Sequence, residues 1–251
     1  DQVKDFLTGI RPMPAVFVPQ STLDRYKKVS AATVWSAVRR FGSPRCTLEG
    51  VLPMTPGRRM AARARTLRTL PPRPDLQAEL PRGENSMVGQ AIALCGPGDA
   101  LVVDGMRQPT CAPLGDVLLL QLKMQKADAL VMDCAIRDLD IVRTYGFAIF
   151  ALARTPNALE NTMAYQVNVD IQCAGVLVRP GDVLVGDDDG VVVVPSHQAE
   201  EIINWVEEHE EAEEYAKDKI VAENVRPGKY YPPSEEFIKE MHRIKGSKSN
   251  G

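Results

Sequence analysis

The spacing of apolar residues along the chain predicts a succession of short strands and helices. Short apolar runs bounded by charged or turn-forming residues are typical of buried strands, and such runs lie at residues 101–103, 129–132, 147–152, 176–178, 183–185 and 191–194. Segments with helical spacing or helix boundary signals lie at residues 29–41, 87–95, 139–145, 196–223 and 234–244. This mixture predicts an α/β fold in which a central sheet is flanked by helices.

A basic segment at residues 58–73 is predicted to contain a strand with one solvated face. At residues 62–68, arginines partly alternate with small or apolar residues, which matches the period of a strand. A basic run is also compatible with RNA binding. However, no Phe, Tyr or Trp lies within it, so the base-stacking element of single-strand binding is missing. We therefore favour a solvated strand over a nucleic-acid contact.

Composition argues against several classes of partner. The chain has 251 residues and a formal net charge of −3, which gives no electrostatic reason to expect nucleic acid or a membrane as its main partner. No apolar run approaches the roughly 20 residues that a membrane helix needs. The N-terminal residues show no signal-peptide pattern. We expect a cytoplasmic protein whose partner is a small molecule.

Cysteine and histidine usage narrows the chemistry of any site. The five cysteines are scattered without a C-x-x-C pair, which argues against a structural zinc site and a disulfide framework. The three histidines all lie in the C-terminal quarter of the chain, outside the apolar strand-rich region. A histidine-based triad or metal site is therefore not expected. Any metal would be held by oxygen ligands, which favours Mg²⁺ or Mn²⁺.

The candidate site consists of Asp116 and the pair Arg137-Asp138. Asp116 opens a predicted helix, and the pair follows the predicted strand at residues 129–132. A helix start and the end of the next strand can meet at one edge of a sheet, where open α/β sheets bind ligands. Two carboxylates and a guanidinium there suit a divalent cation and an anionic substrate. Taken singly, Asp116 is also typical of a helix cap, and Arg137-Asp138 of a surface ion pair.

The spacing of Asp116, twenty further residues and then Arg137-Asp138 resembles the D-x20-R-D signature of the RraA-like family. The segments at residues 97–105, 175–182 and 186–195 also fit that family, and the resemblance covers residues 28–215. The family contains class II aldolases that cleave 4-hydroxy-4-methyl-2-oxoglutarate and 4-carboxy-4-hydroxy-2-oxoadipate, and also the regulator of ribonuclease activity A. The resemblance implies an RraA-like layered fold, with a central sheet or partial barrel flanked by helices, and a homotrimer or homohexamer.

The resemblance also implies a role for each candidate residue. Arg137 would bind an α-keto acid substrate and stabilise its enolate, and Asp138 would be the direct ligand of Mg²⁺ or Mn²⁺. Asp116 would act through water, towards the metal and in positioning the water that reprotonates the enolate. Backbone N–H groups at the helix start would receive the pyruvyl carboxylate: those of Gly115, Asp116, Val117 and Leu118.

Two further positions are carried over from the family pattern. Asn85 corresponds to an active-site asparagine of the aldolases. A glutamate on the C-terminal helix of a neighbouring subunit completes their site, and here Glu210, Glu213 and Glu214 are candidates. Glu213 fits best by its distance in sequence from Arg137, and would contact the metal through water. The other reading of these glutamates is a solvated acidic helix face.

The sequence therefore predicts a metal-dependent lyase that cleaves a 4-hydroxy-2-oxo acid to pyruvate and a carbonyl compound, with oxaloacetate decarboxylase side activity. One alternative is a non-catalytic binding protein similar to the ribonuclease regulator. Another is a sugar-acid aldolase with the same metal-enolate chemistry. The acidic C-terminal helix favours the aldolase branch, whereas residues 106–113 depart from the glycine-richer loop of relatives.

Three parts of the chain are expected: an N-terminal arm at residues 1–27, a catalytic domain at residues 28–223 and a tail containing Pro and Tyr at residues 224–251. Residues 1–27 and 71–83 are expected to be irregular, because they are rich in proline or lack periodicity. A metal site is one interpretation of the three consecutive aspartates Asp187, Asp188 and Asp189. Since Gly190 follows them between two predicted strands, we favour a turn.

Overall fold

The computed structural model describes residues 16–158 and 161–248. Its strands are β1 (Leu52–Pro53), β2 (Met60–Leu70), β3 (Asp99–Asp104), β4 (Ala129–Ile136), β5 (Ala148–Arg154), β6 (Met163–Val167), β7 (Ile171–Cys173), β8 (Val176–Val178), β9 (Val183–Asp187) and β10 (Gly190–Val194). Its α-helices are α2 (Gln20–Tyr26), α3 (Ala31–Arg40), α4 (Pro74–Glu79), α5 (Met87–Ala93), α6 (Asp116–Met124), α7 (Leu139–Val142), α8 (Ala199–Glu223) and α9 (Glu235–Lys248). Short 3₁₀ turns are η1 (Gly83–Asn85), η2 (Arg143–Tyr145), η3 (Ser196–Gln198) and η4 (Pro227–Lys229).

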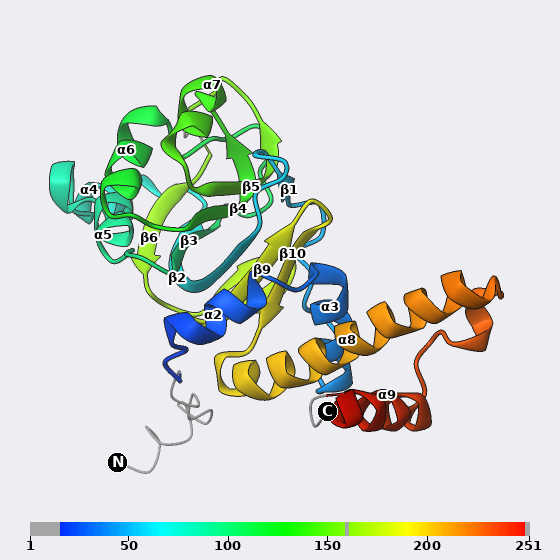
Figure 1. The fold of residues 1–251 in the computed structure, drawn as a ribbon. Coiled ribbons are helices and arrows are strands. Elements are labelled where there is room, and N and C mark those ends of the chain that lie inside the picture. The colour runs from blue at the N-terminus through cyan, green and yellow to red at the C-terminus, as the bar shows by residue number, and fades with distance from the viewer. Residues whose placement is uncertain (1–15, 159–160, 249–251) are drawn as a thin grey trace, which may run out of the picture.

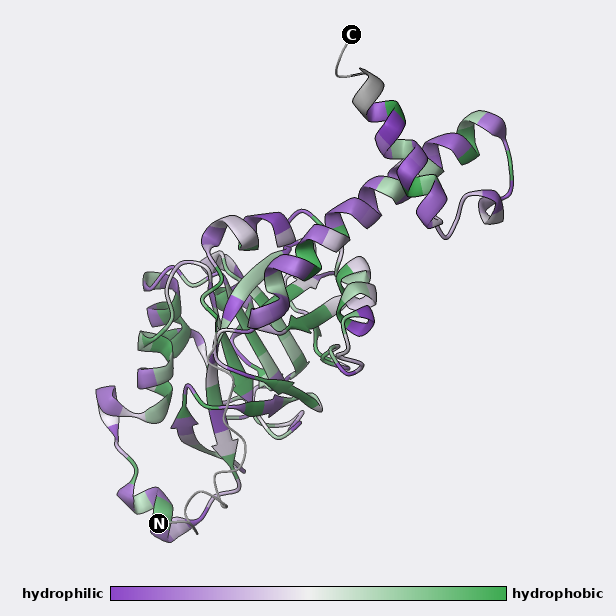
Figure 2. Cartoon of the chain, turned by 90° about the horizontal axis from the view of Figure 1, so that it is seen from below, coloured by the Kyte–Doolittle hydropathy of each residue, from purple (hydrophilic) through white to green (hydrophobic). Residues whose placement is uncertain are grey.

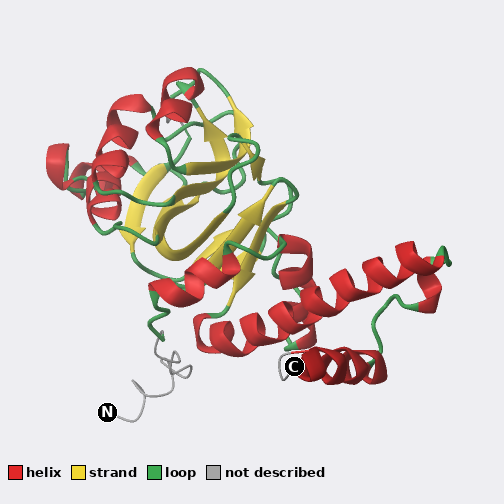
Figure 3. Ribbon diagram, viewed as in Figure 1, coloured by secondary structure: helices red, strands yellow, loops and turns green. Residues whose placement is uncertain are grey.

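One strongly curved sheet forms the centre of the molecule, with helices on its outer side (Figures 1 and 3). The strand order is β1-β5-β4-β3-β2-β9-β10, and β6 pairs with the second half of β2. Strands β2, β3, β4 and β5 are parallel. Since α5 to α7 connect them, the carboxyl ends of all four strands lie at one edge of the sheet. Ligands bind at this edge in open α/β sheets.

The sheet is nearly closed into a barrel by the segment at residues 46–53. The backbone N–H of Leu48 donates to Val191 on β10, and β1, at the end of the segment, pairs with β5. A second sheet, the β7–β8 hairpin, contributes to the apolar interior. These observations confirm the expected α/β class with a partial barrel flanked by helices.

Strand residues alternate between the barrel interior and the helix-covered outer face, as the two-residue period of a strand requires. On β4, Val131 packs in the interior core, whereas Leu130 and Met132 pack beneath α5, α6 and α7. A third apolar cluster joins α2, α3 and α8 to β9 and β10. Figure 2 shows the apolar strands inside and the polar helix faces outside.

The prediction that one face of the basic segment is solvated is wrong. Strand β2 is confirmed, but it lies in the middle of the sheet and is buried along most of its length. Arg63 is buried and its Nε donates to Asp99 at 2.9 Å, and Arg65 pairs with the same carboxylate at 3.1 Å. Arg63, Arg65 and Asp99 therefore form an ion-pair network inside the fold, whereas Arg59 and Arg73, near the ends of the basic run, are exposed.

Two segments expected to be irregular contain helices. Residues 20–26 form α2, which Arg25 ties to Glu207 on α8 by a hydrogen bond of 2.9 Å. Residues 74–79 form α4, which begins with Pro74, and proline is favoured at the first helical position because that N–H has no partner in a helix. The strand expected at residues 129–132 continues to Ile136, and strands β6 and β7 had no clear sequence signal.

The second half of α8 projects away from the barrel and α9 folds back beside it (Figures 1 and 2). Met241 on α9 is buried, and His242 of α9 lies 2.9 Å from Glu208 of α8. Among the described residues, no helix combines the length and apolarity that crossing a membrane requires. The proposed division at residues 27 and 223 stays a prediction.

Candidate active site

The start of α6 and the end of β4 meet at the carboxyl edge of the sheet. The backbone N–H of Asp116 donates to Oδ2 of Asp138 at 3.2 Å. Asp138 precedes α7 with φ 54° and ψ 32°, a left-handed conformation that Asp and Asn tolerate better than most residues. The sharp change of direction after β4 thus turns the Asp138 carboxylate back towards α6. The predicted meeting of Asp116 with Arg137-Asp138 is therefore present in the fold.

Gly115 makes this close approach possible. A Cβ atom at this position would lie 2.5 Å from Oδ2 of Asp138 and 2.7 Å from Nε of Arg137. Both distances are shorter than van der Waals contact, so any side chain would push the Arg137-Asp138 pair away. Gly115 has an extended backbone, with φ −126° and ψ −175°, and its role is therefore close packing rather than turn geometry.

Arg137 has a donor without an acceptor. Its Nε lies 3.3 Å from Oδ2 of Asp138, which is close enough for an ion pair. The Nε–H group is nevertheless buried without a hydrogen-bond partner among the described residues. The Arg137 side chain as a whole is 36% exposed. A buried N–H of this kind is costly unless an acceptor is supplied, and an anionic ligand would supply one.

The start of α6 is already partly engaged within the chain. The N–H of Asp116 donates to Asp138, and the N–H of Val117 donates to Oδ1 of Asp116 at 2.9 Å. The side chains of Val117 and Leu118 are exposed at the surface, 77% and 38% respectively. An incoming carboxylate would therefore have to displace one of these hydrogen bonds or use the N–H groups of Gly115 and Leu118.

Two residues near the site were not singled out from the sequence. The hydroxyl of Tyr145 donates to the backbone carbonyl of Asp116 at 3.2 Å and holds the helix start from the side. Arg154, at the end of β5, is the register partner of Ile136 and thus lies beside the strand end that precedes Arg137. Neither position has a local signal in the sequence, since Tyr145 depends on the contact of η2 with α6 and Arg154 on the pairing of β4 with β5.

A buried polar network lies on the strands that lead into the site. Asp133 on β4 is fully buried and accepts hydrogen bonds from the backbone N–H groups of Gly105 and Ala174, at 2.6 Å and 2.9 Å. The Gln172 amide lies between Asp104 and Asp133 and donates to both. Burial raises the pKa of Asp104. The network fixes the end of β3, β4 and the β7–β8 hairpin relative to one another.

The two residues carried over with the family pattern lie apart from this cluster. Asn85 is exposed in η1, where its carbonyl accepts a hydrogen bond from Gln90. Glu213 lies on α8, 3.4 Å from His209 Nε2. No contact of either residue with Asp116, Arg137 or Asp138 is present within the described part of the chain. The role of Glu213 requires a second subunit and stays a prediction.

The donor set is compatible with a hard divalent cation. Within the described residues, no group of three or more His, Cys, Asp or Glu side chains is placed to hold a metal. Asp138 and Asp116 are the carboxylates at the site, and Mg²⁺ commonly binds through one or two carboxylates while keeping several waters. Asp187 and Asp188 instead bond the backbone N–H groups of Ala31 and Gly57, which supports the turn interpretation.

Comparison with known proteins agrees with this architecture. The chain matches the RraA-like (Aldolase/RraA) family model over residues 31–193, which is more than half of its length. A relative from Halalkalibacterium halodurans, provisionally named 4-hydroxy-4-methyl-2-oxoglutarate aldolase, is 34% identical over 152 residues, covering 61% of this chain and 72% of the relative. The protein described here belongs to the RraA-like family.

Two solved structures have the same fold. Streptomyces coelicolor RraAS2, described as an unusual member of the RNase ES inhibitor RraA protein family, aligns with a TM-score of 0.73 and 30% identity, covering 80% of this chain and 99% of that chain. An uncharacterised protein from Pseudomonas syringae pv. tomato aligns with a TM-score of 0.74 over 87% of this chain and 96% of that chain. Its identity is only 22%, so this second likeness concerns the fold alone.

Proposed function

We propose that this protein is a divalent-metal-dependent lyase that cleaves a 4-hydroxy-2-oxo acid to pyruvate and a second carbonyl compound. The observation that carries the proposal is the half-buried Arg137 guanidinium beside the Asp138 carboxylate, with an Nε–H that has no hydrogen-bond partner among the described residues. A guanidinium with a free donor is suited to a carboxylate or an enolate oxygen. Relatives named for 4-hydroxy-4-methyl-2-oxoglutarate aldolase activity support the same reaction class.

The retro-aldol reaction defines what the site must do. The C3–C4 bond breaks, and its electron pair moves to give the enolate of pyruvate, with negative charge on the C2 oxygen. The C4 hydroxyl loses its proton and becomes the carbonyl of the second product, and C3 of the enolate then gains a proton. We assign the binding of the enolate to Arg137 and the positioning of the water that protonates C3 to Asp116.

We further propose Mg²⁺ or Mn²⁺ as the cofactor. Asp138 would be the direct ligand, while Asp116 and Glu213 of the partner subunit would act through water, which requires a homotrimer or a homohexamer. When bound, the cation would polarise the carboxylate and keto oxygen of the 2-oxo acid. Asp116 is half-buried and Asp138 is exposed at one edge of the sheet, and carboxylate oxygens are the ligand type that these ions prefer.

Oxaloacetate decarboxylation is the expected side activity. Loss of CO₂ from C4 of oxaloacetate breaks the same C3–C4 bond and leaves the same pyruvate enolate. A site that binds this enolate through Arg137 would therefore accelerate both reactions. Oxaloacetate is also a short substrate, so its turnover reports on the enolate end of the site alone.

A non-catalytic binding protein is the second candidate. The likeness to RraAS2 at 30% identity supports it, because that protein is described within an inhibitor family. A sugar-acid aldolase with the same metal-enolate chemistry is the alternative within the lyase class, with the tail at residues 224–251 shaping the substrate pocket. The exposed C-terminal arm of α8 and α9 would suit either a protein partner or a second subunit.

One assay separates these candidates. Pyruvate release from 4-hydroxy-4-methyl-2-oxoglutarate and from oxaloacetate is followed with Mg²⁺, with Mn²⁺ and with EDTA. The lyase proposal expects turnover that depends on metal and that falls by more than about 100-fold in Arg137→Ala, because the enolate loses its charged hydrogen-bond donor. Absence of metal-dependent turnover with both substrates would rule out the lyase as proposed and leave the binding protein as the better candidate.

A further inference from the structure

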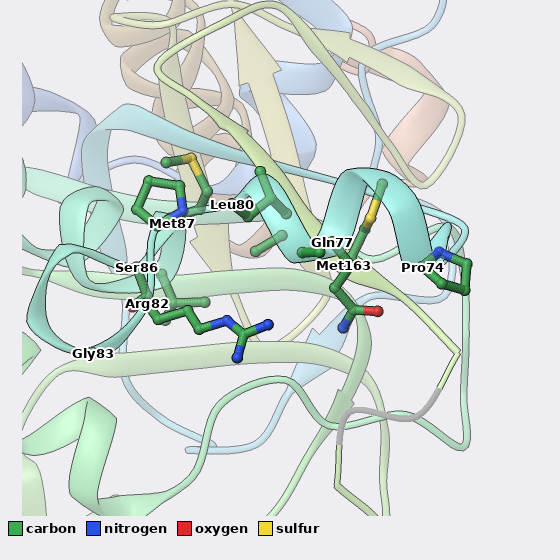
Figure 4. Close-up of a pocket in the computed structure, with 12 residues that line it drawn as sticks. Pro74, Gln77, Leu80, Arg82, Gly83, Ser86, Met87 and Met163 are labelled. Atoms are coloured by element: carbon green, nitrogen blue, oxygen red, sulfur yellow. The ribbon is translucent and has the colours of Figure 1, made fainter.

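A cavity of about 650 Å³ lies at the same edge of the sheet as the candidate site. Its walls come from α4, from the linker at residues 80–83, from the start of α5 and from β6 (Figure 4). The volume falls within the range of sites that bind small molecules. The residues around Asp116 and Arg137 do not line it, so the cavity is an additional compartment beside the reaction site.

The sheet register places the cavity at the level of the reaction site, three strands away. Leu67 on β2 is level with Val103 on β3, which is level with Met132 on β4. Leu70, whose partner Met163 lines the cavity, therefore lies near the level of the end of β4, two strands away. Met163 lies one strand further, on β6, so three strand spacings, about 14 Å, separate it from β4. One elongated ligand can span that distance.

The packing of the helices also connects the cavity to the reaction site. Both α5 and α6 begin at the carboxyl edge, and they pack together on a shared apolar cluster. Val88, at the start of α5, lines the cavity and packs against this cluster, which includes Leu114 beside Gly115. The floor of the cavity and the support of the reaction site are thus parts of one packed layer.

The cavity is lined mostly by apolar side chains and by one cationic side chain, that of Arg82. Leu80, Met87 and Met163 supply hydrocarbon surface, and the backbone is restricted by Pro74, the first residue of α4, and by Pro81, just after this helix. In Figure 4 the Arg82 guanidinium and the Gln77 amide point into the space between these walls. Arg82 is exposed and has no ion pair or hydrogen bond with any described residue. Its charge is available for an anionic ligand.

We propose that this cavity binds the part of the substrate beyond C4, and that this part is an aliphatic chain ending in a carboxylate. The inference rests on the lyase function proposed above and adds its substrate class. The pyruvyl end lies at Arg137, the chain lies along the Leu80, Met87 and Met163 walls, and the terminal carboxylate pairs with Arg82. A cavity with apolar walls and one free guanidinium selects such a chain over a short or purely polar one.

Binding titrations test the proposal without requiring turnover. Straight-chain dicarboxylic acids of increasing length, and monocarboxylic acids of matched length, are titrated by calorimetry into the protein with Mg²⁺. The expected result is at least tenfold tighter binding of one dicarboxylate than of its matched monocarboxylate. Arg82→Leu should remove this preference, and Arg82→Lys should retain part of it. Arg226→Leu, at an exposed arginine far along the chain, is the matched control and should keep it.

Equal affinity of the matched acids in the unsubstituted protein would overturn the proposal, as would a preference that survives in Arg82→Leu. Turnover provides the second readout, with pyruvate adducts of aldehydes that end in a carboxylate or in a methyl group. Failure of the lyase function is seen separately, as absence of metal-dependent pyruvate release from both oxaloacetate and 4-hydroxy-4-methyl-2-oxoglutarate, neither of which has a long chain beyond C4. The two failures are therefore distinguishable.

Discussion

Asp138 accepts a hydrogen bond from the backbone of Asp116, residues that lie 22 positions apart, and so joins the end of one sheet strand to the start of the preceding helix. The same carboxylate oxygen lies 3.3 Å from Nε of Arg137, whose N–H has no hydrogen-bond partner among the described residues. The contact also depends on a neighbour that has no side chain, since Gly115 lies against both Arg137 and Asp138.

Gly115→Ala is expected to impair the site while leaving the fold intact. Alanine tolerates the extended backbone at this position, but its Cβ would lie 2.5 Å from Asp138 and 2.7 Å from Arg137. Displacing catalytic groups by about 1 Å can cost roughly 100-fold in rate. We therefore expect kcat/KM for oxaloacetate to fall by about that factor.

Gly228→Ala is the matched control, because a Cβ there meets no atom within 4 Å. Circular dichroism should show both variants folded. Unchanged turnover in Gly115→Ala would mean that the close packing of Arg137 and Asp138 is irrelevant to the reaction.

Asp138→Asn tests the metal ligand without disturbing the backbone. Asn adopts the left-handed conformation of Asp138 more readily than Ala would, so the turn into α7 is retained. The loss of the negative charge should weaken Mg²⁺ binding and reduce metal-dependent turnover by more than about 100-fold, because even outer-sphere partners contribute 10- to 100-fold. Mg²⁺ titrations of activity measure both effects.

Asp188→Asn is the control for Asp138→Asn. Asp188 accepts a hydrogen bond from the Gly57 backbone in a turn at the far end of the strand pair β9–β10, and this substitution should leave the Mg²⁺ response unchanged. A normal Mg²⁺ response in Asp138→Asn, or a lost one in Asp188→Asn, would contradict the assignment.

The sequence predicted those features that depend on local pattern. The apolar runs marked the strands, and the segment predicted to be helical at residues 29–41 contains α3, which Ser30 caps by accepting from the Thr33 N–H. The signature spacing brought Asp116 and Asp138 together because the helix and strand between them have standard lengths. Local pattern and chain topology were sufficient for this part of the site.

Long-range burial could not be predicted in the same way. Arg63 alternates with alanines as a surface residue would, and only the central position of β2 and the partner Asp99 show that it is buried. The Asp133 carboxylate interrupts an apolar strand, and its donors lie 28 and 41 residues away. Side chains that are satisfied by distant partners leave no periodic signal, so these positions required the folded structure.

Asp133→Ala is expected to lower the free energy of unfolding substantially. The substitution leaves the buried N–H groups of Gly105 and Ala174 without their acceptor, and each unsatisfied donor costs about 1–3 kcal/mol. We expect a loss of more than about 2 kcal/mol in urea denaturation. Asp133→Asn retains one acceptor oxygen and should lose less.

Asp170→Ala is the comparison for Asp133→Ala. Asp170 is exposed and lies 3.3 Å from Arg179, and surface pairs contribute at most about 1 kcal/mol. Similar losses for Asp133→Ala and Asp170→Ala would show that the buried network contributes no more than a surface ion pair.

Asp104→Asn should change how stability depends on pH. Burial raises the pKa of Asp104 above 3.8, the ordinary value that the unfolded chain retains. The folded protein therefore holds this proton more tightly, and the Asp104 contribution to stability declines as pH rises from 3.8 through the raised pKa. An Asn side chain cannot ionise and lacks this decline, while its oxygen can still accept from the N–H of Met106, as the carboxylate does. The free energy of unfolding of Asp104→Asn, relative to the unsubstituted protein, should thus increase between about pH 4 and pH 7.

Urea titrations at a series of pH values measure this difference, and Asp170→Asn controls for the loss of an exposed carboxylate. Parallel pH profiles of Asp104→Asn and the unsubstituted protein would show that burial of this carboxyl is not what limits its ionisation.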